Sequence, residues 1–275
     1  MTVEKDTVTV TQKGQAERIT LVDLRAADRT QQYVEQRARG AYIASICQPE
    51  ASFDYSIAAQ VQQPDDDDIK RLNQRLQWQL DNKQRGLRFV QLDLKRAKLM
   101  VFTDGSFGNN RDLSSQIGYL IALVNEDREG ESFVIRGNIV HYSSVKSKRV
   151  TRSVLASEIY GCANGFDLGY VIGHTLRKVA SRLGVLAIPL VLCTDSYSLY
   201  ECLVKLGSTT EKRLMIDIMG LRESYERREM EIRWVNGQDN PADAMTKGSP
   251  NRALETFVTR NELVVRLEGW VQREE

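Results

Sequence analysis

The chain has 275 residues, enough for one large domain or two smaller ones, and 41% of them are hydrophobic. It can therefore bury a real core, which excludes a broadly disordered protein. Lysine and arginine total 38 against 37 acidic residues, so the net charge is +1. The overall charge indicates no anionic partner by itself, and any nucleic-acid surface must come from local clusters of charge.

The first residues, MTVEKDTVTV, are polar and alternating, and no apolar run approaches the roughly 20 residues needed to cross a bilayer. We therefore expect an intracellular protein with no membrane partner, and the abrupt start also fits a piece of a longer polyprotein. The four cysteines lie in apolar segments without a CxxC pair, which favours buried, reduced thiols over disulfides or a zinc site.

Helical spacing in the first part of the chain predicts a helix over 30–47, a short helix within 49–62 and a third helix after the acidic run 65–68. Aspartates at a helix start favour the helix dipole, so we interpret the run as a helix start. The same acids could suggest the Tyr-x-Asp-Asp hairpin of a polymerase. No tyrosine stands at the required position and no strand surrounds the run, so we expect no polymerase site.

From residue 87 the pattern changes to strands. We expect strands at 99–103, 117–125, 133–143, 188–195 and 230–237. A long helix at 153–183 separates the third strand from the fourth, two helices follow within 196–206 and 209–229, and a final helical region begins near residue 240. This order predicts an α/β fold with a mixed sheet of five strands and helices packed on its faces.

A right-handed crossover from the third strand places the fourth strand beside the first and parallel to it. Asp104 and Asp195 then stand at the carboxyl ends of neighbouring parallel strands, where open sheets bind ligands. Glu158 lies near the start of the crossover helix, and Asp243 follows the last strand. Each acid alone also fits a turn or the first turn of a helix.

Taken together, the four acids would repel one another without a cation, and carboxylate oxygens suit Mg²⁺ or Mn²⁺. Two such ions about 3.5–4 Å apart can activate a water and stabilise the leaving oxygen of a phosphodiester. The constellation therefore indicates metal-dependent hydrolysis of a phosphate backbone.

The loop SSVKSKRVTRS concentrates cations beside the predicted site, and cations interleaved with serine and threonine suit phosphate contacts. A solvated loop is the alternative interpretation. The cations are Lys146, Lys148, Arg149 and Arg152. Four polar residues near the acids could contact the 2′-hydroxyls that distinguish RNA from DNA. These are Ser106, Asn109, Ser196 and Asn240.

From about residue 98 to 248 the chain resembles the ribonuclease H domain that follows the polymerase in reverse transcriptases, in the motifs FTDGSF, SVLASEIYG, LCTDSYSLYE and NPADAMTK. The ending ADAMTK is similar to the Ala-Asp-x-hydrophobic-Thr-Lys motif of copia-type (Ty1/copia) retrotransposon Pol polyproteins. Upstream, RGAYIASICQPEASFDYSIAAQ and IKRLNQRLQWQLDNKQRGLRF resemble the stretches past the polymerase palm and in the thumb and connection. The resemblance implies a helical connection/thumb-like segment over 1–96 and a ribonuclease H-like domain over 97–275.

The resemblance also implies that Asp104, Glu158, Asp195 and Asp243 are the catalytic metal-binding tetrad, with two Mg²⁺ or Mn²⁺ ions. It implies hydrolysis of the RNA strand of RNA/DNA hybrids, a polymerase domain as partner, and a location in cytoplasmic virus-like particles and the nucleus. The loop VNGQDNPAD lacks the histidine that many ribonucleases H carry before the last acid.

Two alternatives remain open, a catalytically silent nucleic-acid-binding scaffold of the same fold and a different nuclease or integrase. The intact tetrad argues against the scaffold, and the glutamate on the crossover helix argues against an integrase.

Overall fold

The structure is a computed structural model that describes residues 1–4, 6–185, 188–205, 209 and 211–271. The chain divides into two compact units, Met1–Phe89 and Val90–Glu275. The sequence placed a boundary slightly later, between residues 96 and 97, and the connection/thumb-like character of the first part stays a prediction. Within the described ranges, none of the helices has the length and apolar character that a membrane span requires.

The first unit holds the three predicted helices, α1 (Arg29–Cys47), α2 (Ser52–Ala58) and α3 (Asp66–Asp81). The acidic run starts α3 with a capping box. The side chain of Asp65 accepts a hydrogen bond from the Asp68 amide at 2.8 Å, and the side chain of Asp68 accepts one from the Asp65 amide at 3.2 Å. The helix-start interpretation of this run is confirmed.

A small sheet, absent from the sequence prediction, completes the first unit. Its strands, in the order β1-β2-β3, are β1 (Thr2–Glu4), β2 (Thr7–Thr11) and β3 (Gly86–Val90). The alternation of threonine and valine in β1 and β2 is a strand signal that the sequence prediction missed, and β3 is only five residues long. The helices pack around a core that includes Tyr33, Ile43 and Leu76.

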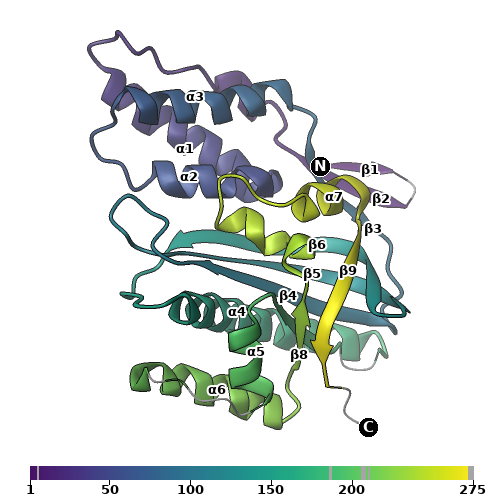
Figure 1. Ribbon diagram of the computed structural model, residues 1–275. Helices are drawn as coiled ribbons and strands as arrows, with labels where there is room; N and C mark the ends of the chain where they lie inside the picture. Colours follow the sequence, from purple (N-terminus) through teal and green to yellow (C-terminus); the bar gives the residue numbers. More distant parts are fainter. Residues whose placement is uncertain (5, 186–187, 206–208, 210, 272–275) are drawn as a thin grey trace. The chain divides into compact units, whose positions relative to one another are not determined.

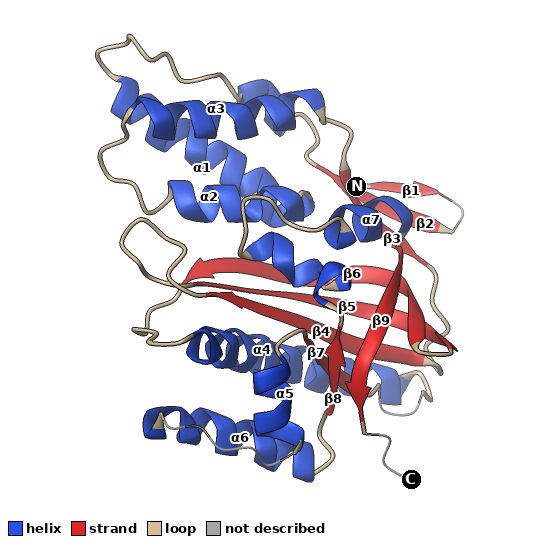
Figure 2. Cartoon of the chain, in the orientation of Figure 1, coloured by secondary structure: helices blue, strands red, loops and turns tan. Residues whose placement is uncertain are grey.

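The second unit is built on six strands, shown in Figures 1 and 2. They are β4 (Ala97–Ser106), β5 (Gln116–Glu129), β6 (Ser132–Lys146), β7 (Leu190–Thr194), β8 (Glu231–Val235) and β9 (Glu262–Trp270). The strand β4 pairs antiparallel with β5 and parallel with β7, and β7 pairs parallel with β8. The predicted placement of the fourth strand beside the first is therefore confirmed.

The strand β9 is the largest departure from the predicted five-stranded sheet. It pairs antiparallel with both β6 and β8 and closes the strand order β4-β5-β6-β9-β8-β7 (Figure 2). Buried Leu263 and Val265 alternate with exposed residues, a period that favours a strand. The predicted final helical region is therefore wrong for residues 262–270, which form a strand.

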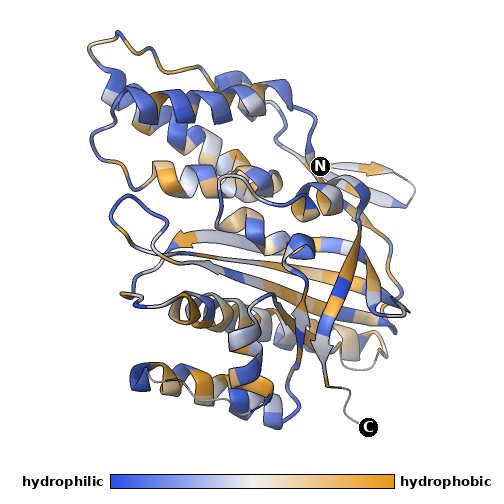
Figure 3. Cartoon of the chain, in the orientation of Figure 1, coloured by the Kyte–Doolittle hydropathy of each residue, from blue (hydrophilic) through white to orange (hydrophobic). Residues whose placement is uncertain are grey.

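The helices of the second unit are α4 (Val154–Arg182), α5 (Tyr197–Val204), α6 (Met215–Glu226) and α7 (Ala253–Arg260). In Figure 1, α4 covers one face of the sheet, and the short 3₁₀ helix η5 (Pro241–Met245) lies on the opposite face. Hydrophobic residues concentrate along the strands between these layers (Figure 3). The four cysteines are free and buried, as predicted.

Close packing of α4 on β4 depends on two glycines. A Cβ at Gly105 would lie 2.4 Å from the carbonyl carbon of Ser157, and one at Gly161 would lie 2.7 Å from the carbonyl oxygen of Asp104. Neither position has room for a side chain, so glycine allows the helix to approach the end of the strand. This approach brings the first turn of α4 beside Asp104.

Candidate active site

Three carboxylates from three elements converge at one end of the sheet. Asp104 lies near the end of β4, Glu158 lies in the first turns of α4, and Asp195 follows β7 directly. One oxygen of each lies within 4.8 Å of one oxygen of each of the others. Strand order predicts that Asp104 and Asp195 lie close together, and the start of the crossover helix predicts Glu158 near them; the structure places all three carboxylates together.

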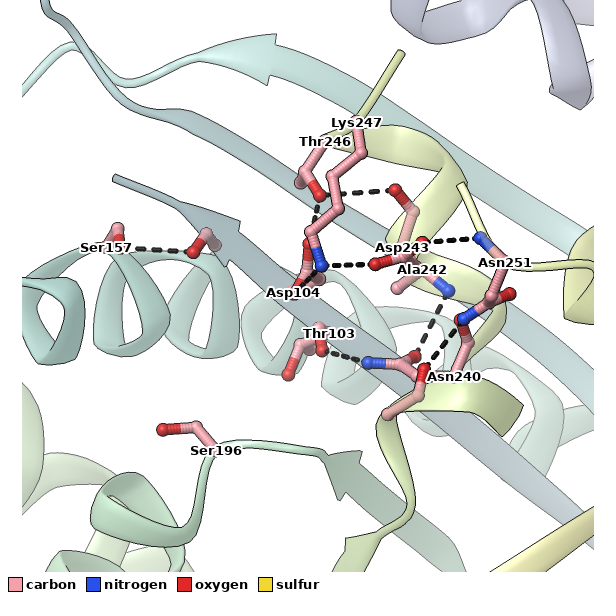
Figure 4. Close-up of polar contacts among 12 residues, drawn as sticks. Thr103, Asp104, Ser157, Ser196, Asn240, Ala242, Asp243, Thr246, Lys247 and Asn251 are labelled. Atoms are coloured by element: carbon pink, nitrogen blue, oxygen red, sulfur yellow. Dashed lines mark hydrogen bonds and ion pairs between the residues drawn. The ribbon is translucent and has the colours of Figure 1, made fainter. Parts of the chain in front are cut away.

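Asp243, the fourth predicted acid, lies on η5 and is held differently. Its Oδ1 forms an ion pair with the ammonium of Lys247, and its Oδ2 accepts a hydrogen bond from the Asn251 amide at 2.7 Å. It is buried, and it lies outside the group of three acids that the described residues form. Lys247 links it to that group, because its ammonium also lies 4.0 Å from Oδ1 of Asp104 (Figure 4).

The electrostatics of the three acids are those of buried like charges. Burial raises the pKa of Asp104 to about 6, and the negative charge of Asp195 adds to the effect. Burial also raises the pKa of Glu158 well above its usual value, with further increases from Asp104 and Asp195. The pKa of Asp195 is raised by burial too, while Lys247 opposes the shift. The group therefore favours a state with added positive charge.

Two oxygens of this group lack a hydrogen-bond partner. Oε2 of Glu158 and Oδ1 of Asp195 are buried and receive no hydrogen bond from any residue in the described part of the chain. A buried carboxylate oxygen without a donor is costly, because it has lost water without compensation. A divalent cation with a preference for oxygen ligands would satisfy both atoms, so the residues present fit Mg²⁺ or Mn²⁺.

Neighbouring side chains hold the acids in place. The hydroxyl of Thr246 donates to Oδ2 of Asp104, and Trp234 Nε1 donates to the carbonyl oxygen of Asp195 at 3.2 Å. Burial lowers the pKa of the Lys247 ammonium, but attraction by Asp104 and Asp243 outweighs it, and the net pKa is raised. The lysine therefore stays charged between these carboxylates at neutral pH.

Thr246, Lys247 and Asn251 were absent from the sequence-predicted site. Thr246 and Lys247 stand inside the quoted NPADAMTK motif, and Lys247 follows Asp243 by four residues. A cation four residues after an acid is a known ion-pair spacing, so this signal could have identified Lys247. Asn251 contributes a backbone amide, and the side-chain pattern gives no signal for it.

The four residues predicted to contact 2′-hydroxyls differ in how exposed their side chains are. Ser106 ends β4 and is half-buried, while Asn109 is exposed and donates to the carbonyl oxygen of Thr246 at 3.3 Å. Ser196 is the N-cap of α5 and accepts from the Leu199 amide at 3.3 Å.

Asn240 is the exception among them. It is fully buried, donates to the carbonyl oxygen of Thr103 at 3.0 Å and accepts from the Ala242 amide at 3.1 Å (Figure 4). Its side chain holds the loop before η5 against β4 and is not presented to a ligand in this structure.

The predicted basic loop follows β6 and leads to α4. Lys148, Arg149 and Arg152 are exposed, and Lys146 forms an ion pair with Asp112. The guanidinium of Arg149 donates to both carboxylate oxygens of Asp217, at 2.8 and 3.1 Å, and its carbon lies 5.0 Å from the centre of the Tyr160 ring. Arg149 is thus fixed on the surface by Asp217 and Tyr160.

Neither histidine belongs to the acid group. His141 lies on β6 and stacks with Tyr119 at 5.8 Å between ring centres, and His174 is exposed on α4. Both imidazoles therefore lie apart from the three carboxylates, and we assign no proton transfer to either of them.

In comparisons with known proteins, the chain is similar to transposon polyproteins. The Transposon Ty1-NL2 Gag-Pol polyprotein of Saccharomyces cerevisiae is 22% identical over 170 residues, covering 59% of this chain and 8% of that polyprotein. The chain therefore spans a small part of the length of the curated relatives it matches. No family model matches the chain.

Solved structures that the chain is similar to include the RNase H1 of the halophilic archaeon Halobacterium salinarum NRC-1. The identity is 21%, the TM-score is 0.36, and the match covers 57% of this chain and 98% of that one. A foamy viral protease-reverse transcriptase in complex with an RNA/DNA hybrid matches 81% of this chain and 26% of its own, with 11% identity and a TM-score of 0.38.

Proposed function

We propose that this chain, a ribonuclease H-like protein related to the Gag-Pol polyproteins of Ty1 transposons, is a metal-dependent endonuclease that cuts the RNA strand of RNA/DNA hybrids. The observation that carries the proposal is the convergence of Asp104, Glu158 and Asp195 within 4.8 Å, with two buried oxygens that lack donors. A folding core has no use for three such carboxylates, because their burial and mutual repulsion destabilise the chain.

In this proposal Asp104, Glu158 and Asp195 hold the first divalent cation, and Asp243 completes a tetrad for two ions. Bound Mg²⁺ or Mn²⁺ supplies Lewis-acid chemistry, by which a water becomes a nucleophile and the leaving oxygen of a phosphodiester is stabilised. Thr246 fixes the orientation of Asp104 through its hydroxyl. The closed packing of α4 on β4 fixes Glu158 relative to both aspartates.

Substrate contacts in this proposal come from the surface around the acids. Lys146, Lys148, Arg149 and Arg152 would contact backbone phosphates, which position a nucleic acid without reading its sequence. Ser106, Asn109 and Ser196 would contact the 2′-hydroxyls of the RNA strand. The polymerase part of the same polyprotein would supply further contacts to the hybrid.

The experiment is cleavage of an end-labelled RNA strand annealed to DNA, with duplex DNA and duplex RNA as competing substrates, in Mg²⁺, Mn²⁺ or EDTA. We expect divalent metal to support cutting of the hybrid RNA alone. Asp104→Asn and Asp195→Asn should abolish cutting while hybrid binding persists. Asp127→Asn is the matched control, because Asp127 is an exposed acid on β5 paired with Arg96, and it should cut at the rate of the parent.

Binding without cutting under either metal would overturn the nuclease proposal and favour the scaffold function. Equal cutting by Asp104→Asn and the parent would also overturn it, since the reaction would then not depend on the acid group.

A further inference from the structure

The side chain of Lys247 occupies the space between two of the site acids. It follows η5 and reaches back so that its ammonium pairs with Oδ1 of Asp243 and lies 4.0 Å from Oδ1 of Asp104 (Figure 4). Both carboxylates are buried. In the described part of the chain, the ion pairs of these two carboxylates involve this one ammonium.

The four acids therefore form two groups that differ in whether their carboxylate oxygens have a partner. On one side, Lys247 neutralises Asp243 and faces Asp104. On the other side, Oε2 of Glu158 and Oδ1 of Asp195 have no hydrogen-bond donor among the residues that the structure describes. Asp104 belongs to both parts, since it lies in the group of three acids and also faces the ammonium.

We infer that Lys247 is a displaceable counter-ion, which competes with a divalent cation for the position between Asp104 and Asp243. The inference rests on the proposed function, because it assumes that the acids bind metal. It assigns Lys247 a positioning role: the lysine sets how readily metal reaches the Asp243 side of the site.

The surroundings of Lys247 allow its ammonium to leave without a change of backbone. Its side chain is 44% exposed, so a path to solvent exists. The Lys247 amide donates to the carbonyl oxygen of Asp243 at 3.1 Å, and the Asn251 amide donates to Oδ2 of Asp243 at 2.7 Å. Both hydrogen bonds persist when the ammonium moves, so Asp243 stays where it is and only its Oδ1 is freed.

A neutral residue at position 247 should change metal binding in a defined direction. Two cations near one carboxylate repel each other, and removal of the fixed charge removes that repulsion. We expect Lys247→Gln to bind Mn²⁺ and Mg²⁺ more tightly, by about fivefold, because metal then no longer has to displace a partly exposed ion pair. We also expect it to melt at a lower temperature in EDTA, because Asp243 then lacks a counter-ion, and to recover when metal is added.

The test is calorimetric titration of the chain with MnCl₂ or MgCl₂, with melting temperatures in EDTA and in saturating metal. Lys247→Arg keeps the charge and should stay near the parent in metal affinity. Lys70→Gln is the matched control, because Lys70 pairs with Asp67 on α3 in the first unit, and it should leave metal affinity unchanged. Tighter binding by Lys247→Gln alone supports the inference, whereas unchanged or weaker binding overturns it.

A second measurement on the unmodified chain keeps the inference testable if Lys247→Gln fails to fold. The NMR signal of the Lys247 Cε should shift and sharpen as Mg²⁺ is added, because the ammonium moves into solvent. A signal unmoved by saturating metal overturns the inference. A parent chain that binds metal and displaces Lys247 but cuts no hybrid would overturn the proposed nuclease function alone.

Discussion

The hydroxyl of Thr246 donates a hydrogen bond to Oδ2 of Asp104, a residue 142 positions earlier in the chain, and both side chains are buried. This contact joins the segment after η5 to the end of β4. It is also the hydrogen bond that opposes the rise in the pKa of Asp104 caused by burial and by Asp195. Thr246 therefore positions the central carboxylate of the proposed site and favours its ionised form.

Replacement of Thr246 by valine should lower the cleavage rate with little change of fold. Valine keeps the shape and removes the donor, and one hydrogen bond to a charged group is worth about 1.5–3 kcal/mol. We expect a loss of about tenfold or more in kcat, measured on the labelled hybrid. Thr175→Val is the control, because the Thr175 hydroxyl donates to a backbone carbonyl on the exposed side of α4. Equal rates for Thr246→Val and the parent would contradict the positioning role.

The raised pKa of Asp104 predicts how the stability of the metal-free chain depends on pH. The folded chain holds this proton up to pH about 6, whereas the unfolded chain releases it near its ordinary pKa of about 3.9. Between these values the folded state binds more protons, so the free energy of unfolding falls as pH rises and stays reduced above pH 6.

Asp104→Asn has no carboxyl group to ionise at this position, so its free energy of unfolding should not fall for this reason as the pH rises. In EDTA it should exceed the parent in unfolding free energy by about 1–3 kcal/mol above pH 6, and the difference should shrink towards pH 4. Urea denaturation at several pH values measures this. A difference that is constant across the range would show that Asp104 is not protonated in the folded chain.

Close packing of α4 against β4 predicts opposite effects for two glycine substitutions. Gly161→Ala would place a Cβ 2.7 Å from the carbonyl oxygen of Asp104, and such overpacking costs about 1–3 kcal/mol. Gly220→Ala on α6 meets no atom within 4 Å and should stabilise its helix by about 0.5–1 kcal/mol. Urea denaturation of both variants tests this, and a stabilising Gly161→Ala would contradict the packing.

The basic loop predicts a change in the salt dependence of hybrid binding. Lys148→Gln and Arg152→Gln should each reduce affinity and lower the slope of log affinity against log salt by about 1, because one phosphate contact releases about one counter-ion. Arg227→Gln is the control, since Arg227 is an exposed cation paired with Glu223 at the end of α6. Unchanged slopes for both loop variants would identify the loop as a solvated surface.

The sequence predicts the parts of the fold that periodicity and chain order determine. The strand pairing of β4 with β7 follows from the handedness of the crossover, and Asp104 and Asp195 meet for that reason. The strand β9 was not predicted from the sequence. Its partners β6 and β8 are distant in sequence, so its pairing is not visible from the local pattern of residues 262–270.

The site also contains some residues that the sequence predicts and others that it does not. The acids are visible because carboxylates at strand ends are unusual, whereas the burial of Asn240 and the pairing of Lys247 depend on how the segment after β8 folds back over β4. That path is set by hydrogen bonds that join the segment to other parts of the chain, among them the one from the Asn251 amide to the Asp243 carboxylate and the one from the Asn240 side chain to the carbonyl oxygen of Thr103, and no periodicity in the sequence predicts these partners.

The most direct test of the central claim is the anomalous scattering of Mn²⁺ in crystals of this chain. The account predicts a peak bounded by carboxylate oxygens of Asp104, Glu158 and Asp195, at about 2 Å from each, and its loss in crystals of Asp195→Asn. A crystal soaked in excess Mn²⁺ with no peak among these three carboxylates would contradict it.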